Sequence, residues 1–320
     1  MPVRSASPGD IPAEMKIPVD SYAWLAAAKI VAPIYLLLLA AYLLAAHTSY
    51  PALALIVLPF LGGQIHKITM IMHDCCHGTL FRDRKLNNFV GVAGGYFVGA
   101  DFYTYRKLHW EHHACYGEGE DPQGDNYLGL ENANRWQLTW HLFKPLIGFN
   151  LFRVIKSLIG PQALNGLLRR DARSEHENGK RAGKGRNLLA TLGGIILVQS
   201  TIVATATGFG NVWWTALLYP VAAATFALFF AHVRGFAEHV NLPHQQAAGH
   251  ARTHLPNWFD KLFLYGLNFN YHIEHHAHPS VPSCYLPRIH ETMREEKELP
   301  DLSESMMGTI IRRFRATSEA

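Results

Sequence analysis

Charged side chains are scarce in this 320-residue chain, where Asp, Glu, Lys and Arg make up 17% of the residues. Soluble domains carry about 25%. Hydrophobic residues reach 49%, and they fall in long blocks, which is typical of a membrane protein. The net charge of +4 is modest, and the positively charged residues are concentrated in particular loops. Nothing in this pattern indicates binding to nucleic acid.

Cysteine is also sparse, with four residues and no CxxC motif. Cys75 and Cys76 are adjacent and make poor partners for each other. A disulfide framework is therefore not expected. The protein is expected to lie in a reducing compartment. The first 20 residues lack an apolar core with a small-residue cleavage site, so no signal peptide is predicted. We expect a soluble N-terminal arm over residues 1–22.

Four apolar blocks have lengths close to the 20 or so residues that cross a bilayer. They cover about residues 23–46, 51–72, 187–207 and 211–231. Only a few residues separate the first from the second and the third from the fourth. Each pair therefore predicts a tight helical hairpin, which gives four transmembrane helices arranged as two hairpins.

The short connectors at 47–50 and 208–211 contain no Lys or Arg. The arm, the central section and the tail contain nearly all of these residues. The positive-inside rule then predicts that both termini and the central section lie in the cytosol. We expect an all-α membrane domain over 23–290 and a charged tail over 291–320.

Two further stretches fit helices that do not span the membrane. Phe89 to Ala100 is apolar, too short to cross, and contains four glycines, which predicts a re-entrant or interfacial helix packed through small residues. Trp136 to Leu168 mixes aromatic, aliphatic and basic residues, as interfacial helices do. Arg169 to Arg186 is strongly polar and is predicted to be an exposed loop.

Histidines gather in three short motifs. HDCCH covers residues 73–77, HWEHH covers 109–113, and HIEHH covers 272–276. Positions i, i+3 and i+4 lie on one side of a helix, so each motif is expected to present its imidazoles in one direction. His239 lies beyond the fourth apolar block and is a further candidate. The predicted ligands are His73, His77, His109, His112, His113, His239, His272, His275 and His276.

Eight or nine imidazoles are too many for one metal ion, because a zinc ion takes about four ligands. They suit two ions. Imidazole binds Zn, Cu, Fe and Ni, so the ligand type leaves the metal open. The membrane setting favours redox-active iron. The topology places all three motifs and His239 on the cytosolic side, as a histidine-rich cap.

Acidic residues adjoin several of these histidines. A ligating histidine usually donates its other ring N–H to a carboxylate or carbonyl, which predicts such a role for Asp74, Glu111, Glu238 and Glu274. Asn268 lies one turn before His272 and could hold a metal-bound water. Solvated, ion-paired or helix-capping roles are the alternatives for these five residues.

With these motifs the chain resembles the integral-membrane fatty acid desaturase and hydroxylase superfamily over roughly residues 45–290. HDCCH, HWEHH and HIEHH match its three histidine boxes in order and spacing. The run from Asn270 to His276, followed by His278-Pro279 and Leu286-Pro287, looks like the bacterial acyl desaturase subgroup. Ala237-Glu238-His239 looks like the subgroup's additional ligand segment.

The resemblance implies a non-haem diiron centre, O2 as oxidant, and a separate electron donor. No HPGG motif of a fused cytochrome b5 occurs, so the expected donor is another protein, a ferredoxin or a cytochrome b5-like protein. The implied substrate is a lipid or carrier-bound acyl chain, and the implied location is the bacterial inner membrane. One position departs from the pattern, because stearoyl-CoA desaturases have an asparagine where this chain has Gly235.

Three functions remain open from the residues. An acyl desaturase is favoured. A hydroxylase or ketolase of another lipid, such as a carotenoid or an alkane, would use the same boxes. A non-redox zinc hydrolase or metal transporter fits the sequence less well. Such proteins would have about three or four ligands per metal ion and would carry them within the membrane spans.

Overall fold

The computed structural model describes residues 11–149 except 131, 188–240 except 209 and 211, 251–295, 299, and 304–317. The described residues form helices and connecting turns without strands. The longer α-helices are α1 (Asp20–His47), α2 (Leu58–His77), α3 (Arg84–Val98), α4 (Phe102–Cys115), α5 (Arg135–Phe143), α8 (Leu188–Thr207), α10 (Leu228–His239), α13 (Leu286–Glu295) and α14 (Met306–Ala316). Three shorter ones are α9 (Leu218–Ala222), α11 (Trp258–Phe263) and α12 (His272–Ala277).

Single turns connect several of these helices. The 3-10 turns are Ala13–Lys16, Pro51–Val57, Gly124–Asn126, Lys144–Ile147, Trp213–Leu217 and Ser283–Tyr285. A wide turn of π-helix at Ala223–Ala227 joins α9 to α10. Because the chain stays helical through it, the segment from Trp213 to His239 forms one apolar rod.

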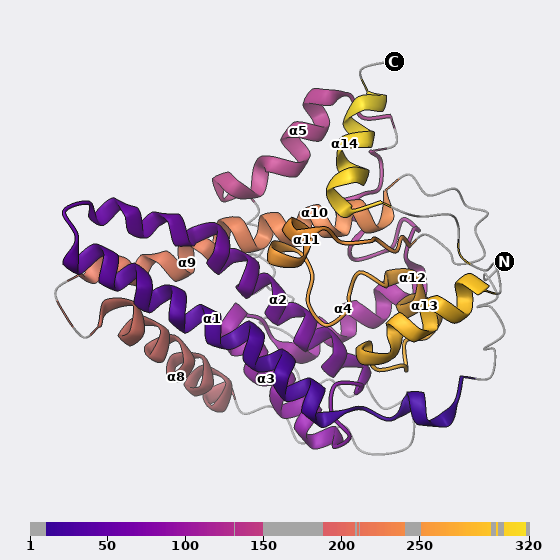
Figure 1. The fold of residues 1–320 in the computed structure, drawn as a ribbon, viewed down its shortest axis with the longest axis horizontal. Helices are drawn as coiled ribbons and strands as arrows, with labels where there is room; N and C mark the ends of the chain where they lie inside the picture. The colour runs from indigo at the N-terminus through magenta and orange to yellow at the C-terminus, as the bar shows by residue number, and fades with distance from the viewer. Residues whose placement is uncertain are drawn as a thin grey trace.

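Helix α2 is the centre of the bundle. It packs against α1, α3, α9, α10 and α11, and in Figure 1 it runs into the middle of the molecule with α1 below it and α10 above it. Its side chains Leu61, Ile65, Ile68 and Met72 are almost fully buried. The central position explains why both its apolar stretch and its histidine-bearing end are enclosed by other elements.

Three helical segments are long and apolar enough to cross a membrane: Ala13–His47, Pro51–His77 and Trp213–His239. They contain the predicted spans 23–46 and 51–72 and most of 211–231. The predicted span 187–207 is also a helix, α8 (Leu188–Thr207), and its described side chains form an apolar stretch from Gly193 to Thr207. The all-helical prediction is confirmed, with three candidate spans in the described part of the chain.

The glycine-rich stretch forms α3, as the sequence predicts, and packs closely against its neighbours. A Cβ at Gly94 would lie 2.8 Å from the Met72 side chain, and one at Gly91 would lie 2.3 Å from the Phe102 ring. Both distances are below van der Waals contact. The small residues therefore allow α3 to approach α2 and the start of α4.

Helix α5 carries an exposed apolar face. Trp136, Trp140 and Phe143, followed by Ile147 in the next turn, are all exposed and recur at the spacing of one helix side. This arrangement agrees with the predicted interfacial helix at the start of Trp136–Leu168. Residues 150–168 and the predicted loop Arg169–Arg186 lie outside the described residues.

The two ends of the chain help to cover the histidine-bearing end of the bundle. Met15 from the N-terminal arm packs in a small core with Ile273 of α12 and Ile289 of α13. In the C-terminal segment, Met306 and Ile310 of α14 join the main core, and α14 packs against α10. The N-terminal arm thus covers α12, and the C-terminal helix covers α10, which carries His239.

Candidate metal centre

Four helices deliver the predicted ligand histidines to one region. His73 and His77 lie in the last turns of α2, and His239 is the last residue of α10. Helix α4 carries the second histidine motif and α12 carries the third. His73, His77 and His239 thus lie at the ends of apolar helices, whereas α4 and α12 are separate helices that carry the other two motifs.

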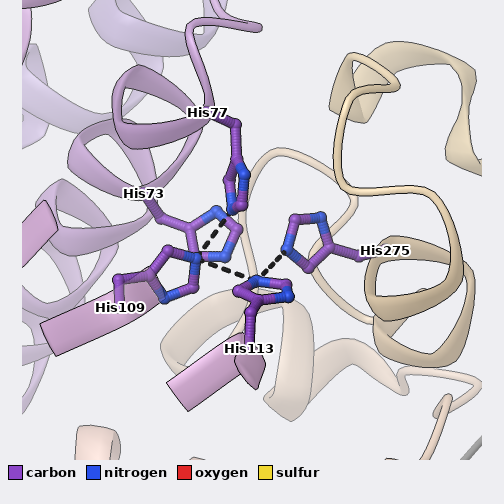
Figure 2. A group of neighbouring side chains, drawn as sticks. All are labelled: His73, His77, His109, His113 and His275. Carbon is purple, nitrogen blue, oxygen red and sulfur yellow. Dashed lines mark hydrogen bonds between the residues drawn. The ribbon is translucent and has the colours of Figure 1, made fainter. Parts of the chain in front are cut away.

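Five of the nine histidines form one group, which we call the five-histidine cluster: His73, His77, His109, His113 and His275. Figure 2 shows their rings turned toward a common centre. The Nε2 atom of His109 lies 2.7 Å from that of His77 and 3.0 Å from that of His113. The Nε2 atom of His275 lies 3.1 Å from that of His113.

The other four form a second group, the four-histidine cluster: His112, His239, His272 and His276. Here the Nε2 atom of His272 lies 3.1 Å from that of His239 and 3.2 Å from that of His276. The two clusters adjoin, since the rings of His113 and His276 stack with centroids 4.4 Å apart. All nine predicted ligands are thus brought into two neighbouring groups.

The second and third histidine motifs divide between the clusters, which corrects the expectation that each of them points in one direction, whereas His73 and His77 of the first motif share one cluster. His109 and His113 enter the five-histidine cluster, whereas His112 enters the other. Successive residues on a helix are about 100° apart. The i and i+4 positions therefore differ by about 40°, but i+3 and i+4 differ by about 100°. The same geometry separates His275 from His272 and His276.

Metal ligation fits this arrangement. Within each cluster the candidate ligand atoms lie within 4.8 Å of one another, and an ion bound at about 2.0–2.1 Å from each nitrogen needs separations up to about 4.2 Å. The Nε2 atoms of His73 and His112 are buried and have no hydrogen-bond partner among the described residues. Buried polar atoms are rarely left unpaired. The donor set therefore suits two imidazole-bound ions.

Burial keeps these imidazoles neutral. Desolvation, aided by neighbouring imidazoles, lowers the pKa of His109, His272 and His275 well below its usual range. The same causes lower the pKa of His113 to about 2. A neutral ring retains one nitrogen lone pair at physiological pH, and ligation requires that lone pair.

Asp121 supports the four-histidine cluster, although it is not among the residues predicted from the sequence. The Nδ1 atom of His112 lies 2.9 and 3.0 Å from its two carboxylate oxygens. Tyr127 donates its hydroxyl hydrogen to the same carboxylate, and the backbone N–H of Gln123 donates to it at 2.8 Å. This arrangement leaves Nε2 of His112 directed at the cluster.

Electrostatics agree with an ionised Asp121. Burial alone would raise the pKa of Asp121, but the hydrogen bonds from His112, Tyr127 and the backbone N–H of Gln123 hold that pKa below its usual range. The ring of Tyr127 also packs against His239, with centroids 4.9 Å apart. Residues 117–127 thus contact two members of the four-histidine cluster. An aspartate in a glycine-rich loop just after a histidine motif is the signal that could have indicated this role.

Three of the predicted carboxylates are buried near the clusters. Asp74 has one oxygen 3.4 Å from Nδ1 of His73, while its other oxygen accepts a hydrogen bond from Ser283. Glu238 lies 3.7 Å from Nε2 of His272 and 3.3 Å from Nε of Arg234. These two carboxylates touch ligand candidates.

Glu274 is placed differently. Its carboxylate accepts hydrogen bonds from Thr253 and His290, which connect α12 to the preceding loop and to α13. None of these recorded partners is a predicted ligand. Its contacts therefore fix the position of α12 rather than the orientation of a single imidazole.

Glu111 and Asn268 are directed elsewhere. Glu111 forms an ion pair with Lys107 at 3.8 Å on the exposed side of α4. Asn268 donates to the Ser283 carbonyl at 3.1 Å and has a left-handed backbone with φ of 59°. The structure does not bring either side chain to a cluster.

Gly235, one helical turn before His239, is covered by a side chain from another segment. A Cβ at this position would lie 2.9 Å from Nδ2 of Asn126. The Asn126 amide oxygen lies 2.9 Å from Nδ1 of His232. An asparagine amide therefore lies beside Gly235, but residue 126 supplies it, which sequence position alone could not indicate.

Comparison with known proteins places these features in a family. The fatty acid desaturase family model matches residues 48–307. A sphingolipid Δ4-desaturase/C4-monooxygenase from Rattus norvegicus is 24% identical over 237 residues, which cover 71% of this chain and 62% of that protein. A fatty acid desaturase from Bacillus subtilis is 25% identical over 256 residues, covering 76% and 68%. This chain therefore matches somewhat under two thirds of the rat relative's length.

Proposed function

This chain belongs to the fatty acid desaturase family, and from that premise we propose that it is a membrane oxidoreductase that introduces a double bond into a fatty acyl chain. The oxidant is O2, and the electrons come from a separate protein, a ferredoxin or a cytochrome b5-like donor. The cofactor is a pair of non-haem iron ions, one in each histidine cluster. Zinc does not serve this chemistry, because it has no redox states to cycle.

One observation carries the proposal, namely the division of nine mostly buried imidazoles into two adjoining groups. Two iron ions held there would supply the redox chemistry that activates O2 to remove hydrogen from an unactivated methylene. The protein's part is to present nitrogen lone pairs and to exclude bulk water. Asp121 orients His112 through Nδ1, and Asp74 lies beside Nδ1 of His73.

The length of the second apolar segment supports a placement of the clusters outside the hydrocarbon core. Pro51–His77 has 27 residues, seven in 3-10 helix and 20 in α-helix, or about 44 Å, against a hydrocarbon core of about 30 Å. The surplus of about 14 Å lets the last turns of α2 project with His73 and His77. We propose four spans, with α8 as the third, and place the clusters and both termini in the cytosol of a bacterial inner-membrane enzyme.

Hydroxylation is the second candidate because it uses the same site. The rat and Bos taurus relatives are named as both desaturase and C4-monooxygenase, so one family member can carry both activities. For this chain we propose desaturation as the main reaction. Chain length, position of attack and acyl carrier are left to the product assay.

The experiment is lipid analysis of a host that expresses the chain together with a ferredoxin and its reductase. A matched host expresses His275→Ala, which removes one imidazole from the five-histidine cluster. We expect new monounsaturated acyl chains that require O2 and are absent with the variant. Mass spectrometry of the products would locate the double bond.

Other products would change the assignment. Hydroxylated or keto lipids without new double bonds would replace desaturation by the second candidate. If no oxidised lipid formed and the purified protein contained zinc instead of iron, the oxidoreductase proposal would fail.

A further inference from the structure

A cavity of about 340 Å³ lies between α1, α2 and the turn that precedes the third histidine motif. Leu25, Ala26, Lys29 and Ile30 of α1 line one side, Gln64 and Lys67 of α2 line another, and Tyr22, Tyr265, Gly266 and Leu267 complete it. Its size is within the range of ligand pockets. It is distinct from both histidine clusters, since none of the nine histidines lines it.

The cavity is positively charged. Two lysines, Lys29 and Lys67, line it, and its described lining includes no Asp or Glu. Lys67 is only 7% exposed. A buried charge is costly unless it is paired, so the lining favours an anion that would neutralise it.

Lys67 has a hydrogen-bond donor to spare. Its ammonium donates to the backbone carbonyls of Lys261 and Leu262 at 2.9 and 2.8 Å. An ammonium has three N–H donors, so one is left beside the cavity. Nearby, Oε1 of Gln64 is buried without a hydrogen-bond partner among the residues that the structure describes and could accept a hydrogen bond from a hydroxyl. The lining therefore offers donors for an anion and an acceptor for a hydroxyl next to it.

The position of the cavity along the membrane-spanning helices favours a lipid over a soluble anion as its ligand. Lys67 precedes His77 by 10 residues, or about 15 Å of helix, and Lys29 follows Asp20 by nine residues, or about 14 Å. The two lysines thus lie at similar depths from one end of the bundle. With about 14 Å of α2 projecting, Lys67 lies close to the hydrocarbon boundary, where lysine side chains reach toward head groups.

We propose that this cavity binds the anionic head group, phosphate or carboxylate, of a membrane lipid. Lys29 and Lys67 contact the anion, and Gln64 accepts from a head-group hydroxyl. The exposed side chain of Leu25 lies at the cavity wall, where the acyl chains of the lipid leave along α1. The inference uses the membrane placement proposed above but not the metals, so it can fail or hold independently of the oxidation reaction.

The test is lipid binding by the full chain purified in neutral detergent, measured by native mass spectrometry and by the melting temperature. The ligands are phosphatidylglycerol, oleate, phosphatidylcholine and inorganic phosphate. We expect the anionic lipids to bind at least about tenfold more tightly than phosphatidylcholine, because one charge-assisted hydrogen bond accounts for such a factor. Lys29→Gln should remove about that factor.

Two further variants keep the test interpretable. Lys67→Met could fail to fold because Lys67 also holds the end of α11 through two carbonyls, so Leu25→Glu is used to place an opposing charge at the cavity wall. Lys85→Gln changes an exposed lysine of α3 away from the cavity and should bind as the unaltered chain does. Iron content is measured in parallel and should be the same in all of them.

The contrary outcomes are equally definite. Equal binding of phosphatidylcholine and phosphatidylglycerol would overturn the proposal, as would an equal loss in Lys85→Gln. Stabilisation by inorganic phosphate without any preference among lipids would overturn the lipid assignment and leave a phosphate site. Selective anionic-lipid binding without any oxidised product would support the cavity and contradict the enzymatic proposal instead.

Discussion

The two histidine clusters use the same kind of ligand but are held in different ways. In the four-histidine cluster, His112 shares its second nitrogen with both oxygens of Asp121 at 2.9 and 3.0 Å. In the five-histidine cluster, the corresponding contact between His73 and Asp74 is 3.4 Å long. One cluster is thus oriented by a strong, buried hydrogen bond, and the other has only a weak one.

Packing replaces hydrogen bonding in the five-histidine cluster. The ring of Phe269 meets that of His73 with centroids 4.3 Å apart, and Trp110 meets His77 at 4.7 Å. Ring contacts restrict rotation of an imidazole but do not raise its basicity, whereas a carboxylate does both. This difference predicts that removing a carboxylate affects the four-histidine cluster more strongly than the five-histidine cluster.

The largest effect should come from removing one ligand of either cluster. His275→Ala and His272→Ala should each lower product formation more than about 100-fold, beyond the 10- to 100-fold that loss of an outer partner causes. His47→Ala, at the exposed end of α1, is the matched control and should retain activity. If either variant kept most of its activity, the cluster concerned would not be needed for the reaction.

Both clusters share the burial of neutral imidazoles, which makes the metal-free protein sensitive to acid. The pKa of His109, His272 and His275 lies below its usual range in the folded chain, so below about pH 6.5 the unfolded chain binds more protons. Stability should therefore fall as pH decreases, by about 1 kcal/mol for each such histidine at pH 5.5.

The measurement is the melting temperature of the chelator-treated protein at pH 7.5 and pH 5.5. A lower value at pH 5.5 is expected, and His272→Ala should make the decrease shallower because it removes one neutral imidazole. A melting temperature that stayed constant or rose toward pH 5.5 would contradict the neutral state of the rings.

Asp121→Asn directly tests the hydrogen bond that orients His112 in the four-histidine cluster. It should lower metal affinity at the four-histidine cluster by about 10- to 100-fold, because an amide cannot stabilise the His112 ring as a carboxylate does. The measurement is metal content after dialysis at defined free Fe²⁺ concentrations. Glu111→Gln is the control, since Glu111 pairs with Lys107 on the exposed side of α4 and should retain both metals.

Asp74→Asn should have the smallest effect on metal binding. The contact of Asp74 with His73 is long, and its other oxygen already accepts from Ser283, so we expect a loss below about tenfold at the five-histidine cluster. The same dialysis assay measures it. A loss larger than that of Asp121→Asn would reverse the comparison between the two clusters.

Much of the fold is encoded locally and could be predicted. Apolar blocks of bilayer length fix the helices around 23–46 and 51–72, and the three motifs with His239 identify all nine clustered histidines. The placement of His73, His77 and His239 at the ends of apolar helices follows from counting residues along a helix. The wide turn at Ala223–Ala227 leaves no such signal, because its residues are ordinary helix formers.

Contacts between distant segments could not be predicted. Neighbours in sequence on a helix point about 100° apart, so Glu111 beside His112 faces solvent, while Asp121 reaches His112 from the next loop. The division of His112 from His109 and His113 depends on how α4 is placed between α2, α10 and α12. Asn126 beside Gly235 likewise reflects tertiary packing.

The central claim is that each cluster holds one iron ion, and metal analysis tests it most directly. The chain is purified without oxygen after expression in iron-supplemented medium, beside His275→Ala and His272→Ala, and the metals are counted per chain. The account predicts two irons in the unaltered chain and close to one in each variant. A single metal ion in the unaltered chain, or zinc in place of iron, would contradict it.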